Sequence, residues 1–586
     1  MKPSVPRILS ALLLLISLSP APSYSSACPE STTDWIRVSP QRPESGDTLR
    51  IKAISTRGGL TEIRLETRGE QRTVNSHPTS GPPWVLDATA TLPSSGQLRI
   101  LAMRNDEVVA CQDLEQSPSQ EKSSTGWTRS DEAFYSAWIA QLFDGPAEEE
   151  LSFRSLEPVI RDPRRNFLYG HLGNDEDRKL PATPDCADLP YFLRAYFAWK
   201  VGLPVAYRSC DRGTGSRPPH CGSATIDTRF STGTVSASAF SQFSHKLFDT
   251  VHSGSARTGI NDDSTDFFPL ALQRDALWPG TVYADPYGHT LILVKWIKAQ
   301  DGKPGILLAA DAQPDNSVTR KRFWEGNFLF ADIPGAGAGF KAFRPIIWKA
   351  GRYASLSNSD LERQSYFGTY SAEQSHLEPD DFYAKVEKAI NPDGLRPLNA
   401  YTGKLDALTE QVRTRVQAVE NGQRWARTHP GTIIPMPQGS QVFETTGAWE
   451  DFASPSRDMR LLIALRVVAK FSDSVRQHPD LFRLDNETPE SAAEEVERYH
   501  NDRIREIRFD YVRTDGTPYT LTLEALFNRR SSLETGYNPN DCAERRWGAA
   551  PGTEEYRPCT RLAPADQQAR MEKYRPWFQS MQRPTR

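Results

Sequence analysis

The side chain best suited to chemistry in this 586-residue chain is the thiol of Cys186. It lies in a stretch that ends at Gly202 and whose apolar residues recur near helical spacing: Leu189, Phe192, Leu193, Tyr196 and Phe197. Pro190 fits a helix only in its first turn, so the helix is expected to begin within a few residues of Cys186 and to end at Gly202. A thiol at a helix N-terminus faces the positive end of the helix dipole, which lowers its pKa. Cys186 is therefore a candidate nucleophile; the alternative is a buried, inert cysteine.

The cysteine count favours the nucleophile. The chain has seven cysteines, and proximity in sequence suggests three disulfides: Cys28–Cys111, Cys210–Cys221 and Cys542–Cys559. Cys186 is left over, and a free thiol in an oxidising compartment is a liability unless it is used. Cys210, His220 and Cys221 lack a fourth ligand at zinc spacing, so no metal site is predicted.

The first 27 residues have the pattern of a signal peptide. Lys2 and Arg7 precede an apolar run too short to span a bilayer, and small residues stand just before Cys28. A lipoprotein signal would also end at a cysteine, but it prefers an aliphatic residue where this chain has Ser25. Ordinary export to the periplasm or beyond is therefore expected. No later apolar stretch is long enough to predict a transmembrane span.

A second stretch, residues 277–296, supplies a candidate base. Pro279-Gly280 begins a strand, a turn follows at 286–288, and His289 opens the next strand. A further hairpin near residue 301 brings residues 311–315 beside His289. Asp311 and Gln313 are two positions apart, so both point to one face of their strand, and either is placed to hydrogen-bond the imidazole. Asp311 is the preferred partner.

These residue types fit nucleophilic catalysis without a cofactor. Cys186 would attack a carbonyl, His289 would take and return the proton, and Asp311 would hold the imidazole tautomer. The backbone N–H of Cys186 is expected to supply half of an oxyanion hole. The other half is assigned to an earlier residue such as Asn166 or Tyr169, or to a backbone group.

The two stretches resemble known cysteine hydrolases. The order of a cysteine on a helix, a histidine on a strand and a polar residue on the next strand resembles the papain-like superfamily. Within it, DCADLPYFLRAYF and LWPGTVYADPYGHTLILV resemble the helix and strands of NlpC/P60 cell-wall peptidases. The resemblance covers roughly residues 130–345 and implies a peptidase or amidase acting on peptidoglycan peptides. The Cys-His-Asp set is also that of bacterial transglutaminase-like proteins.

The chain as a whole is expected to be an α+β protein in several parts. After the signal peptide (1–27), residues 28–112 resemble a small immunoglobulin-like β-sandwich: apolar and polar residues alternate along its strands, and a turn at 57–59 separates 48–54 from 60–66. Residues 113–129 read as a linker, 130–350 as the papain-like catalytic domain, and 351–586 as a mainly helical domain of unknown role. The net charge of −4 and the lack of a long basic run argue against nucleic-acid binding.

The sequence thus predicts an exported cysteine peptidase or amidase with Cys186, His289 and Asp311 as its catalytic residues and a peptide or peptidoglycan substrate. Two alternatives stay open. A transglutaminase-like acyl transferase would use the same residues with an amine as acceptor. A non-catalytic envelope binding or scaffold protein would keep Cys186 as a core residue.

Overall fold

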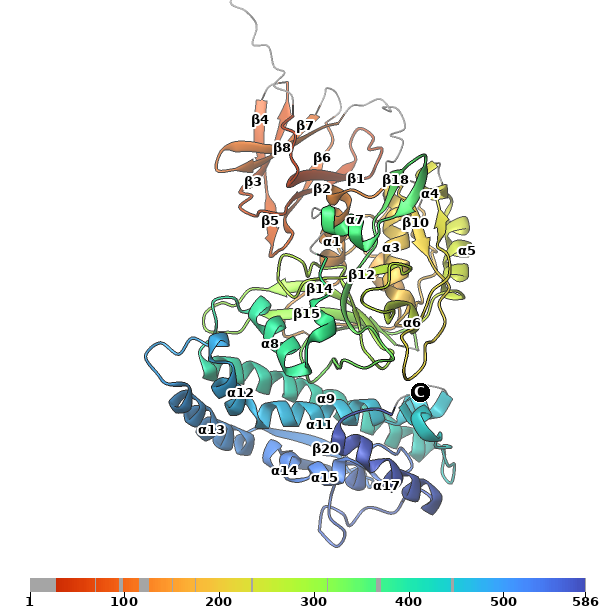
Figure 1. The fold of residues 1–586 in the computed structure, drawn as a ribbon, viewed down its shortest axis with the longest axis vertical. Coiled ribbons are helices and arrows are strands. Elements are labelled where there is room, and N and C mark those ends of the chain that lie inside the picture. The colour runs from red at the N-terminus through yellow and green to blue at the C-terminus, as the bar shows by residue number, and fades with distance from the viewer. Residues whose placement is uncertain are drawn as a thin grey trace, which may run out of the picture.

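A computed structural model describes residues 28–68, 70–93, 98–114, 126–149, 151–173, 175–232, 235–313, 315–364, 370–443 and 447–584. The predicted signal peptide (1–27) and most of the predicted linker (115–125) lie outside these ranges. The protein is a mixed α and β structure with antiparallel sheets. Figure 1 shows three parts stacked along the longest axis: a β-rich part, a central sheet with its helices, and a helical part.

The N-terminal part consists of two four-stranded antiparallel sheets. Their strands are β1 (Asp34–Ser39), β2 (Thr48–Ser55), β3 (Glu62–Thr67), β4 (Glu70–Val74), β5 (Ser76–Thr79), β6 (Trp84–Thr91), β7 (Leu98–Arg104) and β8 (Glu107–Leu114). The sheet orders are β1-β2-β6-β5 and β4-β3-β7-β8. The predicted strands are present, and the chain between β2 and β3 crosses from one sheet to the other: Leu49 and Ile51 of β2 share a core with Ile63 and Leu65 of β3.

The central part is built on a seven-stranded antiparallel sheet of order β12-β17-β13-β14-β15-β16-β9. The strands are β9 (Ser152–Phe153), β12 (Phe267–Pro269), β13 (Val282–Ala284), β14 (Thr290–Ile297), β15 (Ile306–Ala312), β16 (Val318–Arg322) and β17 (Gly339–Phe343). Alternation along β14 divides its side chains between two cores. Ile292 and Val294 pack with one set of helices, and Leu291 and Leu293 pack on the other side.

Helices cover both faces of this sheet. The Ile292 face packs against α1 (Arg129–Leu142), α3 (Asp188–Val201) and α5 (Ala237–Phe248). The Leu291 face packs against α8 (Pro379–Ile390), so the core of the sheet continues past residue 350. The shorter elements of this part are α2 (Glu157–Ile160), β10 (Val205–Tyr207), β11 (Thr225–Asp227), α4 (Arg229–Thr232), α6 (Ser253–Ala256), β18 (Ile346–Lys349), β19 (Arg352–Ser355), α7 (Asn358–Arg363) and η2 (Glu373–His376).

The C-terminal part is mainly helical. It contains α9 (Pro397–Thr428), η3 (Gly439–Phe443), α10 (Gly447–Phe452), α11 (Pro455–Ala469), α12 (Phe471–Gln477), η4 (Pro479–Leu481), α13 (Pro489–Glu506), β20 (Arg508–Val512), β21 (Pro518–Thr522), α14 (Leu523–Asn528), α15 (Arg530–Leu533), α16 (Ala543–Arg546) and α17 (Ala565–Ser580). A buried ion pair, Arg415–Asp458 at 2.7 Å, joins α9 to α11. Trp324 and Leu329 from the central part lie in the same core as these helices, so the two parts are packed together.

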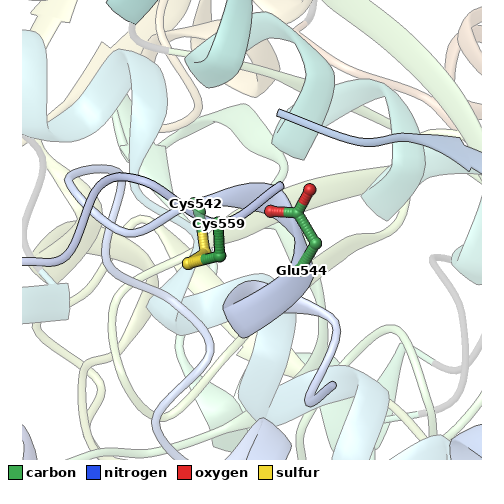
Figure 2. A group of neighbouring side chains, drawn as sticks. All are labelled: Cys542, Glu544 and Cys559. Atoms are coloured by element: carbon green, nitrogen blue, oxygen red, sulfur yellow. A yellow bond between two sulfur atoms is a disulfide. The ribbon is translucent and has the colours of Figure 1, made fainter. Parts of the chain in front are cut away.

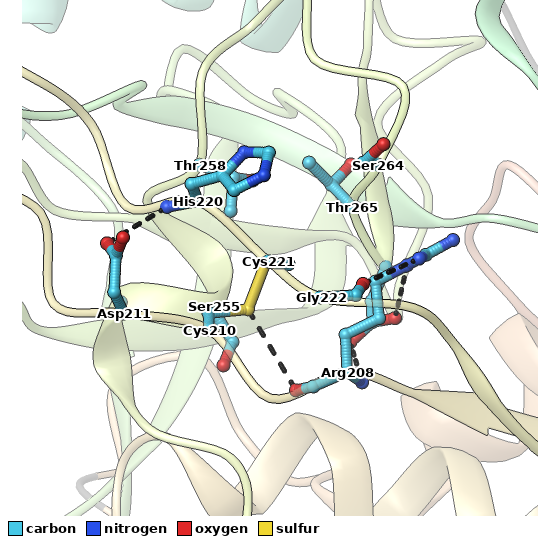
Figure 3. Close-up of a disulfide and its surroundings, with 12 residues drawn as sticks. Arg208, Cys210, Asp211, His220, Cys221, Gly222, Ser255, Thr258, Ser264 and Thr265 are labelled. Atoms are coloured by element: carbon cyan, nitrogen blue, oxygen red, sulfur yellow. Dashed lines mark hydrogen bonds and ion pairs between the residues drawn. A yellow bond between two sulfur atoms is a disulfide. The ribbon is translucent and has the colours of Figure 1, made fainter.

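The three predicted disulfides are present: Cys28–Cys111, Cys210–Cys221 and Cys542–Cys559. Figure 3 shows the Cys210–Cys221 bond, with the backbone N–H of His220 donating to Asp211 beside it. Cys186 is a free thiol, as expected. Three disulfides fit an exported protein. None of the helices in the described ranges is long and apolar enough to cross a membrane.

Candidate active site

Helix α3 places Cys186 immediately before its N-terminal end. The helix runs from Asp188 to Val201, with Pro190 in its first turn, and it stops at Gly202 in the left-handed conformation (φ 74°), as the sequence predicts. Cys186 therefore precedes the N-cap residue Ala187. The first N–H groups of the helix are already satisfied, because the Asp185 carboxylate accepts from the N–H of Ala187 at 2.7 Å and of Asp188 at 3.0 Å.

Buried charges fix the other end of α3. Lys200 is fully buried and forms ion pairs with Glu176 and Asp177, the second at 2.7 Å. Asp177 also accepts a hydrogen bond of 2.6 Å from the hydroxyl of Tyr196. One lysine thus satisfies two buried carboxylates from the loop that precedes Cys186. This network holds the loop and the helix in one arrangement and so fixes where Cys186 lies.

His289 and Asp311 meet at one end of the central sheet. The turn between β13 and β14 carries His289, and its Nε2 lies 2.8 Å from Oδ2 of Asp311 on β15. Gln313 does not contact the imidazole in place of Asp311; its amide donates to the same Asp311 oxygen at 2.9 Å. Of the two partners that the sequence left open, the structure gives the histidine Asp311 and uses Gln313 to hold the carboxylate.

Asp311 is held as a carboxylate. It is 1% exposed, and burial alone would raise its pKa. The charge of Lys321, whose Nζ lies 2.8 Å and 3.0 Å from the two oxygens, and the hydrogen bond from His289 keep the pKa well below its ordinary value. An ionised Asp311 accepts the Nε2 proton of a neutral imidazole, which leaves Nδ1 as the proton acceptor.

The thiol lies near the strand that follows His289. The backbone N–H of Thr290 lies near enough to Cys186 to lower the pKa of its thiol. This N–H is not used by the ladder between β14 and β15, which begins two residues later, at Ile292 and Ala310. Cys186 is partly exposed and also feels the charge of Asp311. The structure therefore pairs His289 with Asp311 and places Cys186 near Thr290, the residue that follows His289.

The resting thiol is protonated, contrary to the prediction of a lowered pKa. Burial, and next the negative charge of Asp185, raise the pKa of Cys186 to about 12, although the Thr290 N–H opposes them. The dipole argument fails because the helix begins after Cys186 and its N–H groups are capped by the Asp185 carboxylate. Asp188 is affected in the same way: burial and Asp185 raise its pKa to about 7.

One half of the predicted oxyanion hole fits the structure, and the other does not. Within the described residues no acceptor takes the backbone N–H of Cys186, so this donor is free beside the thiol. Asn166 cannot be the second donor, because its amide group already donates to the Ile160 carbonyl and to the Tyr196 hydroxyl. The Tyr169 carbonyl faces Arg50 of the N-terminal part.

Among the described residues, one group of metal-ligand side chains gathers away from this site: Cys542, Glu544 and Cys559 (Figure 2). Its two sulfurs are bonded to each other. The Glu544 carboxylate accepts hydrogen bonds of 2.7 Å from the N–H and the hydroxyl of Thr514. Because the sulfurs form a disulfide and the carboxylate already accepts two hydrogen bonds, these side chains are not a set of free metal ligands.

Sequence reasoning gave no role to Lys321, which holds Asp311, or to Thr290, which lies near Cys186. Lys321 lies on β16, where Thr319 pairs with Asp311, so the lysine is one diagonal position away on the same face. The alternation of residues 318–322 predicts that Thr319 and Lys321 share one face of a strand. Only the pairing register shows that this face lies beside Asp311 on β15. No family model, curated protein or solved structure matches this chain.

Proposed function

We propose that this protein is an exported cysteine hydrolase that cleaves peptide or amide bonds with Cys186 as nucleophile. The observation that carries the proposal is the 2.8 Å pair of His289 with a buried, ionised Asp311, next to a residue, Thr290, whose backbone N–H acts on the free thiol of Cys186. A histidine with one nitrogen held by a carboxylate, and a free thiol near the residue that follows it, supply the parts of a thiol–imidazole–carboxylate triad.

In the proposed mechanism His289 acts as a general base on a neutral thiol. The Cys186 proton moves to Nδ1 of His289 as sulfur bonds to the substrate carbonyl carbon, and the backbone N–H of Cys186 donates to the developing oxyanion. The imidazolium then protonates the leaving amine, and the carbon–nitrogen bond breaks. Water, deprotonated by His289, attacks the thioester, releases the carboxylic acid and restores the thiol.

The substrate class follows from the resemblance of residues 130–345 to the papain-like superfamily and its NlpC/P60 members. A cysteine before a helix that packs on an antiparallel sheet, with the histidine at a sheet end, supports this assignment. The N-terminal part would then be an immunoglobulin-like sandwich attached to a cell-wall peptidase. Peptidoglycan peptides are the substrates to test first.

A transglutaminase-like acyl transfer is the second candidate, and two observations favour it. The third residue is an aspartate, as in that group. Asp185 and Asp188 lie beside the thiol, where negative charge attracts a protonated amine acceptor. An added primary amine would then be incorporated into the acyl product in preference to water.

The test is to incubate purified protein with peptidoglycan stem peptides, with and without a labelled amine, and to identify products by mass spectrometry. Cys186→Ala and His289→Ala should each lower turnover by about three orders of magnitude or more. His245→Ala removes an exposed histidine from α5 and is the matched control. Equal turnover by Cys186→Ala and the parent would refute the hydrolase and the transferase alike, and would favour a binding or scaffold role.

A further inference from the structure

A small polar cavity lies between α1, the middle of α3 and the segment that leads into β13. Its volume is about 50 Å³, several times the roughly 10–15 Å³ that one water molecule needs. Arg129, Tyr135 and Ser136 of α1 form one wall, and residues 278–281 form the facing wall. Arg129 is partly exposed and Asp275 at the rim is exposed, so the cavity opens to solvent beside these two side chains.

The cavity is separate from the candidate active site. Strand β13 pairs Val282 with Ile292 and Ala284 with Thr290, so residues 278–281 precede one end of the strand and His289 lies beyond the other. On the helix side the cavity is lined by Arg194, which lies about 9 Å along the axis of α3 from its first residue. A ligand here would therefore occupy a second site, whatever reaction the first one performs.

Three polar groups in the wall of the cavity have no partner. The hydroxyls of Tyr135 and Ser136 and the indole N–H of Trp278 are buried, and none of them forms a hydrogen bond within the described residues. The three side chains are 3%, 1% and 8% exposed. Buried polar groups are nearly always hydrogen-bonded, because an unpaired one loses its contacts with water and gains nothing in return. Three of them around one cavity indicate a polar occupant.

Arg129 brings a positive charge to the same cavity. Its guanidinium carbon lies 3.8 Å from the ring centroid of Trp278, and this stacking fixes the direction of the side chain. In the part of the chain that the structure describes, Arg129 forms no ion pair and no side-chain hydrogen bond. Burial lowers its pKa to about 10, so the guanidinium is still charged at neutral pH.

The other charges around the cavity are balanced or screened. Arg194 donates to both oxygens of Glu132, at 2.8 Å and 2.6 Å, and this pair is neutral as a whole. Asp275 is exposed, so water and salt screen its charge. Arg129 is thus the charge that an occupant meets. A planar fork of N–H donors beside two hydroxyls and an indole N–H matches a carboxylate that carries a further oxygen.

We propose that this cavity binds a small carboxylate with a second oxygen close to it, as in a hydroxy acid or at the C-terminal end of a peptide. Arg129 would bind the carboxylate with paired N–H donors. The hydroxyls of Tyr135 and Ser136 and the N–H of Trp278 would then satisfy themselves on the second oxygen. The proposal does not depend on the proposed hydrolase activity.

The test is a titration of the full chain, followed by saturation-transfer NMR, in a buffer free of other carboxylates and of phosphate. Four probes are compared: glycolate, its neutral amide glycolamide, acetate without the second oxygen, and N-acetylglycine as the end of a peptide. Glycolate should bind about tenfold or more tightly than glycolamide, since only glycolate offers Arg129 a charge. Tighter binding of N-acetylglycine than of glycolate would assign the site to peptide ends, and the reverse order would assign it to free acids.

Two variants separate binding from folding. Arg129→Gln should weaken glycolate binding by about 10–100-fold, because it removes charged hydrogen bonds. Ser136→Ala should weaken glycolate binding by about 3–10-fold and leave acetate binding unchanged. Without ligand, Ser136→Ala should melt at the same temperature as the parent or higher, because it removes a buried hydroxyl that has no partner. Arg498→Gln, at an exposed position on α13, should alter neither binding nor melting.

Three outcomes would overturn the proposal. Equal binding of glycolate and glycolamide, or an unchanged affinity in Arg129→Gln, would mean that Arg129 does not bind the carboxylate. A lower melting temperature in Ser136→Ala with unchanged binding would give this hydroxyl a structural role. Absence of saturable binding by all four probes would mean that the cavity holds water alone.

Discussion

The backbone N–H of Thr290 lies near the thiol of Cys186 and lowers its pKa, so the residue that follows His289 is also a neighbour of the proposed nucleophile. The ladder of β14 with β15 begins only at Ile292 and does not use this N–H. A strand that stayed paired to its end would direct this N–H at β15. β14 is thus unpaired with β15 at the end where it approaches the N-terminus of the helix that follows Cys186.

Asp311→Asn should impair the proposed reaction strongly. Asparagine is close in shape, but it carries no charge to stabilise the imidazolium and its amide can hold the ring in the wrong tautomer. We expect kcat on the peptide substrate to fall by about 10³–10⁴-fold. The control is Gln313→Ala, which removes only a neutral donor to Asp311 and should cost less than about tenfold. Similar losses for both variants would mean that Asp311 does not act through its charge.

The raised pKa of Cys186 predicts a specific loss of stability at alkaline pH. The thiol in the unfolded chain titrates near 8.5, whereas the folded value is about 12. Below the unfolded value both states are protonated and the thiol has no pH-dependent effect. Above it the unfolded chain releases a proton that the folded chain keeps, so folded stability falls as pH rises through this window.

Cys186→Ala should therefore lose less stability than the parent as the pH rises above about 8.5, in the range bounded by the thiol's ordinary value and the raised value of about 12. Urea unfolding at several pH values, with the disulfides intact, measures the difference. The comparison between the two proteins cancels the titration of lysines and tyrosines common to both. A stability difference that is constant with pH would show that the thiol titrates normally.

Asp185→Asn should make the thiol more reactive. Asp185 is the largest charge raising the pKa of Cys186, and asparagine keeps a side-chain oxygen to cap Ala187 and Asp188. Iodoacetamide labelling of Cys186 at pH 8 should speed up on the order of 3–10-fold, because one pKa unit is a factor of ten in thiolate. Asp301→Asn, in an exposed turn with positive φ that asparagine also tolerates, is the control. A slower reaction in Asp185→Asn would contradict the assignment.

Lys200→Met should destabilise the fold. It leaves Glu176 and Asp177 buried without their cation, and breaking such a buried pair costs about 3–5 kcal/mol. Lys246→Met, at an exposed position on α5, should change the free energy of unfolding by less than about 0.5 kcal/mol. Urea unfolding measures both. A small effect of Lys200→Met would mean that the two carboxyls take up protons when the lysine is lost.

Much of the secondary structure was predictable because local signals agree. Alternation and turn residues mark β6, β7 and β8, and helical spacing with Gly202 marks α3. The start of α1 shows the limit of such signals. Ser130 is an acceptable cap by type, but Thr128 is the N-cap, because Asp131 stands three residues after it and completes the reciprocal pair of hydrogen bonds.

The relations that span the chain were not predictable in the same way. The sheet that β2 or β3 joins depends on which apolar faces pack against each other. The alternating apolar residues of the two strands form similar patterns, so the sequence does not distinguish one arrangement from another. The pKa of Cys186 depends on burial and on the direction of the Asp185 carboxylate. Asn166 was a reasonable oxyanion donor by type, but its amide is used inside the core.

The contact between Arg583 and Tyr287 makes the turn that carries His289 part of the boundary with the C-terminal part. Because Tyr287 and Arg583 are far apart in the sequence, the turn gains this neighbour only when the C-terminal part has folded against the central part. A fragment that holds Cys186, His289 and Asp311 but stops before the C-terminal part would leave this side of the turn uncovered.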